Sequence, residues 1–548
     1  MKLILWPLIS VFMMMAVGNA QVFDEKFEHW PLDLKINGHV IVAGDLDDVS
    51  VLGGLIRKSD REKKTAVLLT SPTDAIKASF TKLFSDSGEL QFPNFPKTKK
   101  EIETLLRENH VVVLHSSKPL DEKIVSEIIL AKDAFHDFLR AGHLFVALGG
   151  SSEIVAQSYF EADDSGPSTM DGLNLLPDCV LETNFDGAAD QKRLLSILAA
   201  KKTSVGIGLD KQTALMLSGR KMRVVGSGKA TFVLKSNERD KARVRSISTL
   251  NRRSRDLENF ILDLTQWRRD AMDRSLPQFP AEKPRAPIVE NGTLIIIGGG
   301  GSPRGASSEF IKLAGGVKNA KLVYIPCSEN EDVGKRQGVV ERWKRAGVKN
   351  ATFIHTKDRN RANSDEEFLK PLREATGIYF GGGRQWNFSD SYYGTEAHRL
   401  MKEVLKRGGV IMGSSAGASI QGRYLARATP IGNTKIMAFG YERGGLGFLD
   451  GVAIDQHFAQ RNRFRDMTEL MKRHPQLLGI GIDESTAIVV KKSKAQVIGR
   501  GKVHFYDRSK PFPSEKRDYI ALSAGSEYDL VKRQVLRDSA KKRAPVAE

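Results

Sequence analysis

A serine inside a glycine-rich turn is the side chain of this sequence best placed to act as a nucleophile. Ser415 is the central residue of a Gly-Ser-Ser-Ala-Gly stretch that directly follows the apolar run 410–412. This G-x-S-x-G pattern predicts a strand that turns sharply into a helix. The turn needs glycines because backbone packs against backbone. It lifts the serine hydroxyl above the sheet and aims the N–H of Ala416 at an oxyanion.

A base and an acid follow further along the chain. His457 comes after the apolar run 451–454, and Glu484 comes after 478–482, so both are expected at strand ends. Strands of a parallel sheet end at the same carboxyl edge, where open α/β folds place their sites. An imidazole would take the serine proton, and a carboxylate would orient that imidazole. Taken singly, a core histidine and a surface glutamate are the favoured interpretations.

An internal repeat provides a comparison within the chain. Residues 182–233 align without a gap with 455–506. Gly-Ile-Gly and Thr-Ala recur in both copies, but Asn184 stands at the place of His457 and Lys211 at the place of Glu484. An amide is not a base, and an ammonium group cannot orient an imidazolium.

Divergence at the chemical positions favours a functional interpretation of the triad. We therefore expect a tandem duplication with a working C-terminal copy and an inactive N-terminal copy. In the inactive copy, Ser151 is the expected counterpart of Ser415, with Ser152 as the alternative.

Apolar runs alternate with amphipathic segments in both halves, which predicts parallel sheets with crossover helices. Residues 23–268 form the expected first domain, and a proline-rich linker covers 269–290. Residues 291–510 form the expected catalytic domain, and 511–548 form an extension with a basic tail. The length of 548 residues is too great for one core.

The first 20 residues read as a secretory signal cleaved after Ala20, since Lys2 precedes an apolar stretch that ends in small residues. The stretch is short for a membrane span. A secreted or periplasmic protein is therefore expected.

Composition excludes several other classes of protein. The 2 cysteines cannot form a disulfide framework, and no Cys/His cluster has metal-ligand spacing, so neither a metal nor another cofactor is expected. The net charge of +18 would attract polyanions. The basic residues are dispersed and no nucleic-acid-binding motif accompanies them, so nucleic acid is not an expected partner.

Three motifs in order resemble the cyanophycinase group of serine peptidases (peptidase family S51), relatives of aspartyl dipeptidase. They are Gly-Ser-Ser-Ala-Gly-Ala at 413–418, Asp-Gln-His-Phe at 455–458 and Gly-Ile-Gly-Ile-Asp-Glu at 479–484. The resemblance covers 292–506 well and the first half in degenerate form. It implies Ser415 as nucleophile, His457 as base and Glu484 as the orienting acid. It also implies two tandem flavodoxin-like three-layer α/β/α domains, similar to class I glutamine amidotransferases.

The resemblance extends to substrate. Cyanophycinases cut cyanophycin, an arginine-decorated polyaspartate, to β-aspartyl-arginine dipeptides. Arginines after the histidine are implied to hold substrate carboxylates, and Arg461 and Arg463 match them. Arg465 comes one position early for a third arginine, and Asp466 occupies its place. Guanidinium suits this role because it binds carboxylate bidentately.

Several further residues are expected around the same site. They are Asp455 and Gln456 beside the histidine, Gln385 after the glycines of 381–383, and Gly382, Gly383 and Ala416 as oxyanion donors. The glycines of 298–301 do not fit a nucleotide-binding frame and predict a tight turn.

The sequence thus predicts an exported serine peptidase acting on aspartyl or β-aspartyl bonds, with a peptide or polyaspartate-type substrate and an acyl-enzyme on Ser415. A small aspartyl or isoaspartyl dipeptidase and a non-catalytic binding protein that retains the fold are the alternatives. The chain is expected to function as a homodimer or as an intramolecular pseudo-dimer.

Overall fold

The computed structural model describes residues 37–56, 63–85, 88–150, 152–163, 166–248, 261–333, 338–432, 434–437, 439–511 and 517–540. The expected signal peptide and Ser151 lie outside these residues.

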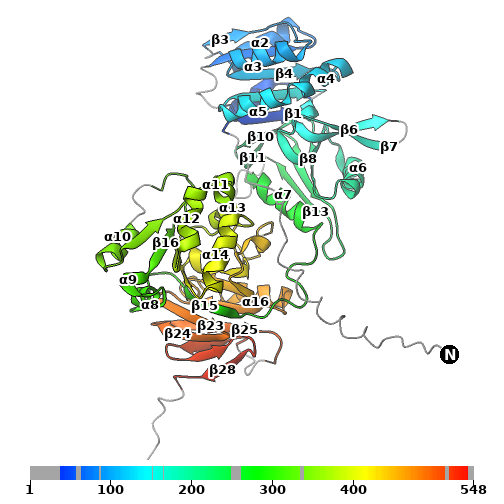
Figure 1. Cartoon of the computed structure of the whole chain (residues 1–548). Helices are drawn as coiled ribbons and strands as arrows, with labels where there is room; N and C mark the ends of the chain where they lie inside the picture. Colours follow the sequence, from blue (N-terminus) through cyan, green and yellow to red (C-terminus); the bar gives the residue numbers. More distant parts are fainter. Residues whose placement is uncertain are drawn as a thin grey trace, which may run out of the picture. The chain divides into compact units, whose positions relative to one another are not determined.

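The second half of the chain is built on a 9-stranded sheet in the order β17-β16-β18-β19-β15-β23-β24-β27-β28 (Figure 1). The strands are β15 (Val289–Ile297), β16 (Lys321–Ile325), β17 (Asn350–Phe353), β18 (Gly377–Phe380), β19 (Val410–Ser414), β23 (Thr486–Lys492), β24 (Lys494–Gly499), β27 (Glu527–Asp529) and β28 (Gln534–Arg537). Strands β15 to β19 pair in parallel, as apolar runs alternating with helices predict.

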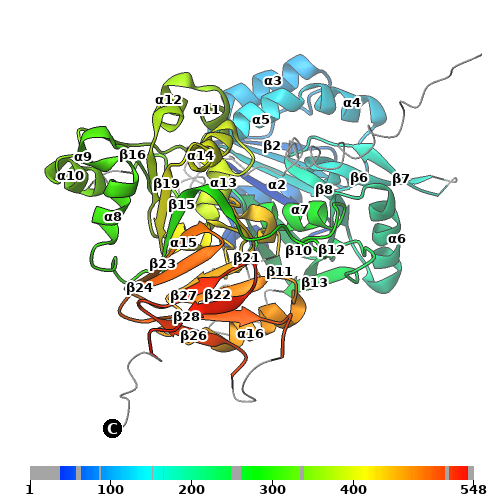
Figure 2. The ribbon, with the colours of Figure 1, turned by 60° about the horizontal axis from the view of Figure 1, so that its bottom comes forward.

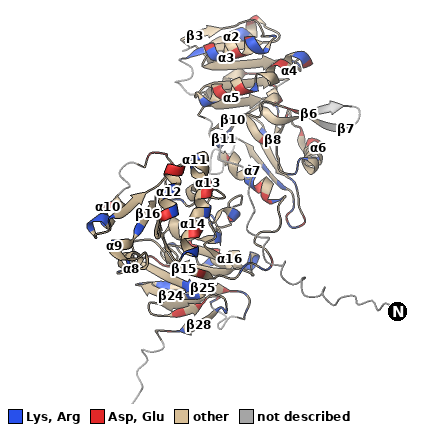
Figure 3. Cartoon of the chain, in the orientation of Figure 1, with Lys and Arg blue, Asp and Glu red and all other residues tan. Residues whose placement is uncertain are grey.

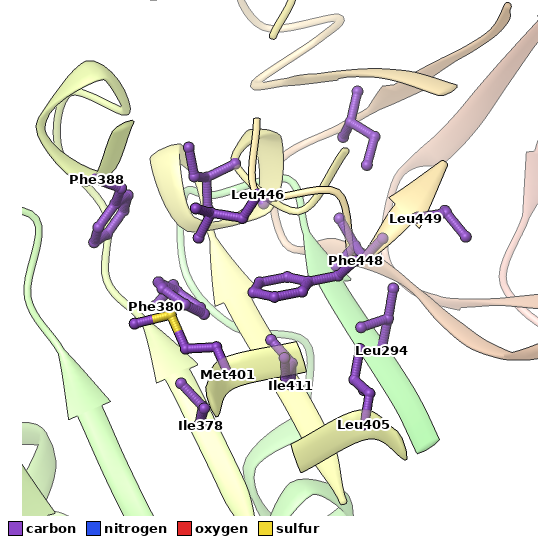
Figure 4. Packing of buried hydrophobic residues seen from close by; sticks show 14 of the residues in the cluster. Leu294, Ile378, Phe380, Phe388, Met401, Leu405, Ile411, Leu446, Phe448 and Leu449 are labelled. Atoms are coloured by element: carbon purple, nitrogen blue, oxygen red, sulfur yellow. The ribbon is translucent and has the colours of Figure 1, made fainter. Parts of the chain in front are cut away.

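Helices cover both faces of this sheet (Figure 2). Phe310 of α8 (Ala306–Leu313) and Trp343 of α10 (Gly338–Arg345) pack on one face, beside α9 (Gly316–Asn319). Residues of α12 (Glu366–Glu374) and α14 (Glu396–Lys406) pack on the other, with α11 (Arg359–Ser364) and α13 (Trp386–Tyr392). Figure 4 shows Met401 and Leu405 of α14 against Leu294 and Ile411 of the central strands.

A second, 5-stranded sheet carries the histidine of the predicted triad. Its order is β20-β21-β22-β25-β26, with β20 (Gly422–Tyr424), β21 (Leu449–Gln456), β22 (Leu478–Ile482), β25 (Lys502–Asp507) and β26 (Ile520–Ser523). The helix α16 (Phe464–Arg473) packs on it through Met467, Leu470 and Met471. Since β22 leads into β23 after only three residues, 483–485 link the two sheets.

The first half also contains two sheets. One has 8 strands in the order β14-β11-β10-β1-β5-β4-β2-β3, and the other has 6 in the order β13-β12-β9-β8-β6-β7. The strands of the first sheet are β1 (His39–Ala43), β2 (Lys64–Leu69), β3 (Glu89–Gln91), β4 (Val111–Ser116), β5 (Leu144–Gly149), β10 (Thr213–Ser218), β11 (Lys221–Gly226) and β14 (Ile261–Asp263). Those of the second are β6 (Ala156–Asp163), β7 (Gly166–Asp171), β8 (Leu176–Thr183), β9 (Val205–Leu209), β12 (Lys229–Leu234) and β13 (Arg243–Ser248).

The helices of the first half lie between these strands in the chain. They are α2 (Asp74–Leu83), α3 (Lys99–Glu108), α4 (Glu122–Leu130), α5 (Lys132–Arg140), α6 (Gly187–Ala200) and α7 (Leu264–Asp273). Phe80 of α2 packs on one face of the 8-stranded sheet, and Ile102 of α3 and Phe135 of α5 pack on the other.

The structure confirms the mixed α/β class but corrects the expectation of purely parallel sheets. Strands β23, β24, β10 and β11 pair antiparallel with their neighbours. The connections explain this, because a parallel crossover needs a dozen or more residues. Only Ser493 separates β23 from β24, so these strands form a hairpin.

Regular elements lie within the stretches expected to be the linker (269–290) and the C-terminal extension (511–548). The helix α7 continues to Asp273, so the irregular stretch begins later than residue 269 and ends where β15 begins. Within 511–548, strands β26, β27 and β28 extend both sheets of the second half.

Basic and acidic residues are interspersed along the helices and strands that Figure 3 colours by charge. No helix among the described residues is both long and apolar enough to span a bilayer.

Candidate active site

Ser415 stands at a strained turn between β19 and the short helix α15 (Ala416–Ser419). Its backbone has φ 57° and ψ −113°, in a region that residues with a Cβ rarely adopt. Glycines on either side make the turn possible. A Cβ on Gly413 would lie 1.9 Å from the Gly417 carbonyl oxygen, and one on Gly417 would lie 2.1 Å from that of Phe380. The geometry therefore requires the two glycines of the G-x-S-x-G pattern.

The structure brings together the three residues of the predicted triad. Ser415 Oγ lies 2.8 Å from His457 Nε2, and His457 Nδ1 lies 2.6 Å from Glu484 Oε1. The serine follows β19, the histidine follows β21, and the glutamate follows β22. A proton on Nδ1 directed at the carboxylate leaves Nε2 free to accept the serine proton.

The environment of His457 favours its neutral form. Burial lowers the pKa of its imidazole below the ordinary value, and the hydrogen bond to Glu484 opposes this shift. The positive charge of Arg461 contributes to the lowering. An imidazole that is neutral near pH 7 can act as a general base.

The glycines of 298–301 form a turn that packs directly against this histidine and glutamate. Ideal Cβ atoms would lie 2.4 Å from His457 Cε1 on Gly299, and 2.4 Å from Glu484 Oε2 on Gly300. The Gly298 carbonyl accepts the N–H of His457 at 2.7 Å, and the Gly299 carbonyl accepts that of Ser485 at 2.8 Å. Sequence reasoning predicted the turn but missed this contact; the run of glycines at a strand end was the available signal.

Asp483 is a second residue that sequence reasoning missed. One carboxylate oxygen accepts the Ala459 N–H at 3.1 Å, and the other accepts the Lys502 N–H at 2.9 Å. Burial alone would raise the pKa of Asp483, but hydrogen bonds from His504 and Lys502 hold it below the ordinary value. The carboxylate thus ties the loop after His457 to the strand end that carries Glu484.

A second loop approaches the nucleophile from β18. An ideal Cβ on Gly382 would lie 3.4 Å from the Cβ of Ser415, and one on Gly383 would lie 2.9 Å from the Cβ of Cys327. Among the described residues, no acceptor takes the backbone N–H of Gly382, Gly383 or Ala416. These N–H groups are therefore available to an oxygen of a ligand, and those of Gly382 and Ala416 belong to residues next to Ser415.

Gln385 lies at the end of this loop, where it is 2% exposed. Its side-chain amide donates to the Arg427 carbonyl at 2.5 Å. That donor is therefore used within the protein rather than directed at an open site.

Asp455, Gln456 and Arg463 were predicted to bind substrate, but the structure places them in a buried ion network. Arg463 donates to Asp455 Oδ1 at 2.7 Å and to the Gln456 side-chain oxygen at 3.3 Å. Arg427, which sequence reasoning missed, donates to Asp455 Oδ2 at 2.7 Å and to Asp466 Oδ2 at 2.8 Å. The network supports the strand end before His457, with its polar groups engaged by one another.

Arg461 differs from Arg463, since its side chain is exposed. No hydrogen bond or ion pair engages its guanidinium within the part of the chain that the structure describes. Its charge is close enough to influence His457. Of the two predicted carboxylate-binding arginines, only Arg461 is available to a ligand.

The corresponding positions of the first half have the same backbone shape but different side chains. Ala43, at the end of β1, pairs with Leu148, just as Ile297, at the end of β15, pairs with Ser414. The residue after Leu148 is Gly149, which therefore takes the position of Ser415 and has φ 81°. This corrects the expected assignment of Ser151 or Ser152. A Cβ on Gly149 would lie 1.9 Å from the Ser116 carbonyl oxygen, so no nucleophile fits there.

The position of His457 is likewise reproduced. Asn184 has φ 55°, close to the 50° of His457, and its side-chain oxygen accepts the Asp45 N–H at 2.9 Å. Lys211, at the place of Glu484, is exposed.

The described residues contain no group of three or more His, Cys, Asp or Glu side chains that could hold a metal. Cys179 and Cys327 are buried and form no disulfide, and burial raises the pKa of the Cys179 thiol.

Comparisons with known proteins agree on one family. The family described as Peptidase family S51 matches residues 294–498. A cyanophycinase from Geminocystis herdmanii is 30% identical over 200 residues, which cover 36% of this chain and 73% of that protein. One from Trichormus variabilis is 25% identical over 282 residues, which cover 48% of this chain and 94% of that protein.

Among solved structures, a peptidase from an acI-B1 actinobacterium is 25% identical with a TM-score of 0.32, over 44% of this chain and 97% of that chain. A putative peptidase E protein from Listeria monocytogenes is 18% identical with a TM-score of 0.28, over 38% of this chain and 99% of that chain.

Proposed function

This chain belongs to peptidase family S51 and is a serine-type peptidase, and we propose that it hydrolyses aspartyl or β-aspartyl peptide bonds through an acyl-enzyme on Ser415. The observation that carries the proposal is the continuous hydrogen-bonded path from Ser415 Oγ through His457 to Glu484. The similarity to proteins named cyanophycinase supports an aspartate-containing polymer or its dipeptides as the substrate class.

In the proposed mechanism, Ser415 Oγ attacks the scissile carbonyl carbon as its proton moves to His457 Nε2. Glu484 stabilises the imidazolium that forms. The N–H groups of Ala416 and Gly382 stabilise the oxyanion, an effect of about 3 kcal/mol in comparable sites. The C–N bond then breaks as His457 returns the proton to the leaving amine. Water repeats the sequence on the ester, which releases the acid and regenerates Ser415.

Arg461 is the residue we assign to the substrate carboxylate. Its exposed and unengaged guanidinium supports this role. Because Arg463 and Asp455 are held in a buried network, we assign them to positioning the strand end before His457.

We also propose that the two halves arose by tandem duplication and that the first half is catalytically inactive. The shared left-handed backbone of Asn184 and His457 supports the first statement. Gly149, which leaves no room for a side chain, supports the second. The basic and apolar pattern of residues 1–20 supports export with cleavage after Ala20.

The test uses the chain from Gln21 onward, incubated with cyanophycin and, separately, with β-Asp-Arg. Release of dipeptide from the polymer that is lost in Ser415→Ala is the expected result. Cleavage of β-Asp-Arg alone would favour the dipeptidase alternative. If neither substrate is cleaved, and a serine-reactive phosphonate does not label Ser415, the proposed hydrolytic mechanism is wrong.

A further inference from the structure

A buried carboxylate in the second half of the chain is paired with arginines from the first half. The side chain of Asp390, in α13, is 1% exposed. Arg220 Nη1 donates to its Oδ2 at 2.7 Å, and Arg269 Nη1 donates to its Oδ1. Within the described residues, both cations that form ion pairs with Asp390 therefore come from residues 39–273.

Contacts within the first half fix the positions of these two arginines. Asp263 accepts two hydrogen bonds from Arg220, including one from Nη2 at 2.9 Å, and also caps α7 by accepting the Gln266 N–H at 2.8 Å. Arg269 lies on α7 and is fully buried. The hydroxyl of Tyr441, from the second half, completes the cluster with a hydrogen bond of 3.0 Å to Asp390 Oδ1.

The charge balance of this cluster depends on both halves. Burial alone would raise the pKa of Asp390, but Arg269 and Arg220 hold it well below the ordinary range. Asp390 therefore stays ionised, and a buried ion that loses its partner is strongly destabilising. Without the two arginines, the Asp390 carboxylate in α13 would lose both of its ion-pair partners and keep only the weaker influence of Lys357.

The helix that carries Asp390 is continuous with the loop beside the nucleophile. It starts at Trp386, directly after residues 381–385, and Gly382 of that loop lies against Ser415. Phe388 of α13 packs edge-on against Phe380, the last residue of β18, with ring centroids 5.3 Å apart (Figure 4). The Arg220 guanidinium lies 5.4 Å from the centre of the Trp386 ring. A displacement of α13 would therefore move the loop that flanks Ser415.

We propose that residues 39–273 act as a built-in subunit of the active half. Their Arg220 and Arg269 neutralise Asp390 and thereby position α13 and the loop 381–383 that borders Ser415. The first half is then required for catalysis although it holds no triad. This proposal depends on the proposed function only in the measurement of Ser415 reactivity.

The experiment compares full-length variants by hydrogen exchange of the amides of 382–392 and by phosphonate labelling of Ser415. Arg269→Met removes one cation while keeping an apolar side chain. Arg269→Met with Asp390→Asn also removes the charge that needs it. Arg473→Gln is the matched control, because Arg473 pairs with Asp240 across the same two halves with both side chains exposed.

We expect Arg269→Met to accelerate exchange and slow labelling by about tenfold or more. The double variant and Arg473→Gln should stay within about twofold of the wild type. Unchanged exchange in Arg269→Met would overturn the proposal. Equal acceleration in the single and double variants would also overturn it, because packing rather than charge would then be responsible.

Two further outcomes remain decisive. If Arg269→Met does not fold, folding of the double variant supports the proposal, and its failure to fold contradicts it. If the wild type is not labelled at all, the proposed function fails, while the exchange measurement still decides the role of the first half.

Discussion

At Ser415, His457 and Glu484, the order of the hydrogen bonds determines which protons can move. The carboxylate contacts Nδ1, so in the proposed mechanism Nε2 is the atom that exchanges a proton with the serine. Burial of the imidazole lowers its pKa, and the glutamate partly restores it. The balance between these two influences sets the pH range in which the base is active.

We therefore predict an acid limb in the pH profile of kcat/KM below the ordinary histidine value of about 6.5. Activity rises with pH through this limb because only the neutral imidazole accepts the serine proton. In Glu484→Gln, loss of the carboxylate should lower kcat by about 10² to 10⁴-fold and move the limb to lower pH. An unchanged or higher limb in this variant would show that Glu484 does not act on His457.

A second residue-scale prediction concerns Arg461. Replacement by glutamine should raise KM for an aspartate-containing substrate by about tenfold, with little change in kcat, because it removes a charged partner of the bound substrate. Arg465→Gln is the control, since Arg465 is exposed on the same segment. Equal effects of the two changes would point to general surface charge instead of a specific contact.

The triad could be predicted from the sequence because each member follows an apolar run, and strand ends converge in parallel sheets. That Gly149 is the counterpart of Ser415 could not be predicted, because two serines follow it closely in the sequence and either could have occupied the turn. The burial of Asp455 and Arg463 was also not predictable. Their pairing depends on Arg427, which lies in a loop without a recognisable pattern.

At the scale of elements, the turn of 298–301 is as closely fitted to the triad as the serine turn. It lies at the end of β15. In the sheet, β15 is between β19, which leads to Ser415, and β23, which begins after Glu484. Its carbonyl groups fix the backbone of His457 and Ser485, and its lack of side chains leaves space for the imidazole and the carboxylate.

Gly299→Ala should reduce kcat/KM by about 10²-fold, because its Cβ would displace the imidazole ring. Gly301→Ala is the matched control. The two glycines have similar φ values of 98° and 106°, but a Cβ on Gly301 would approach nothing closer than Ser485 Oγ at 3.7 Å. Similar losses in both variants would attribute the effect to backbone strain rather than to the histidine.

The alternation of strands and helices was predictable for β15 to β19, because each apolar run is separated from the next by a segment of helical length. The antiparallel strands β23 and β24 form a hairpin whose short connection identifies it only once the strand ends are known. The next strand, β25, belongs to the other sheet, and this assignment depends on tertiary packing that no local pattern encodes.

At the scale of the whole molecule, the two halves share strand pairings and backbone conformations, yet only one contains the triad. Asn184→His together with Lys211→Glu would restore two of its three side chains to the first half. We predict that this double change in a Ser415→Ala background remains inactive, because Gly149 provides neither a nucleophile nor space for one. Labelling by a serine-reactive phosphonate is the measurement, and any labelling within residues 144–155 would contradict the prediction.

The left-handed backbone at Ser415 also bears on how such a protein changes over evolutionary time. A serine held in this conformation lowers stability by about 1–3 kcal/mol, which only catalysis would justify keeping. Under the proposed duplication, a copy released from selection for activity gains stability when glycine replaces that serine. Once a neighbouring carbonyl packs against the glycine, as that of Ser116 does against Gly149, a return from glycine to serine is difficult because no space remains for a side chain. Decay of one copy is then favoured by folding itself, and the surviving copy becomes the only one in which selection can tune activity.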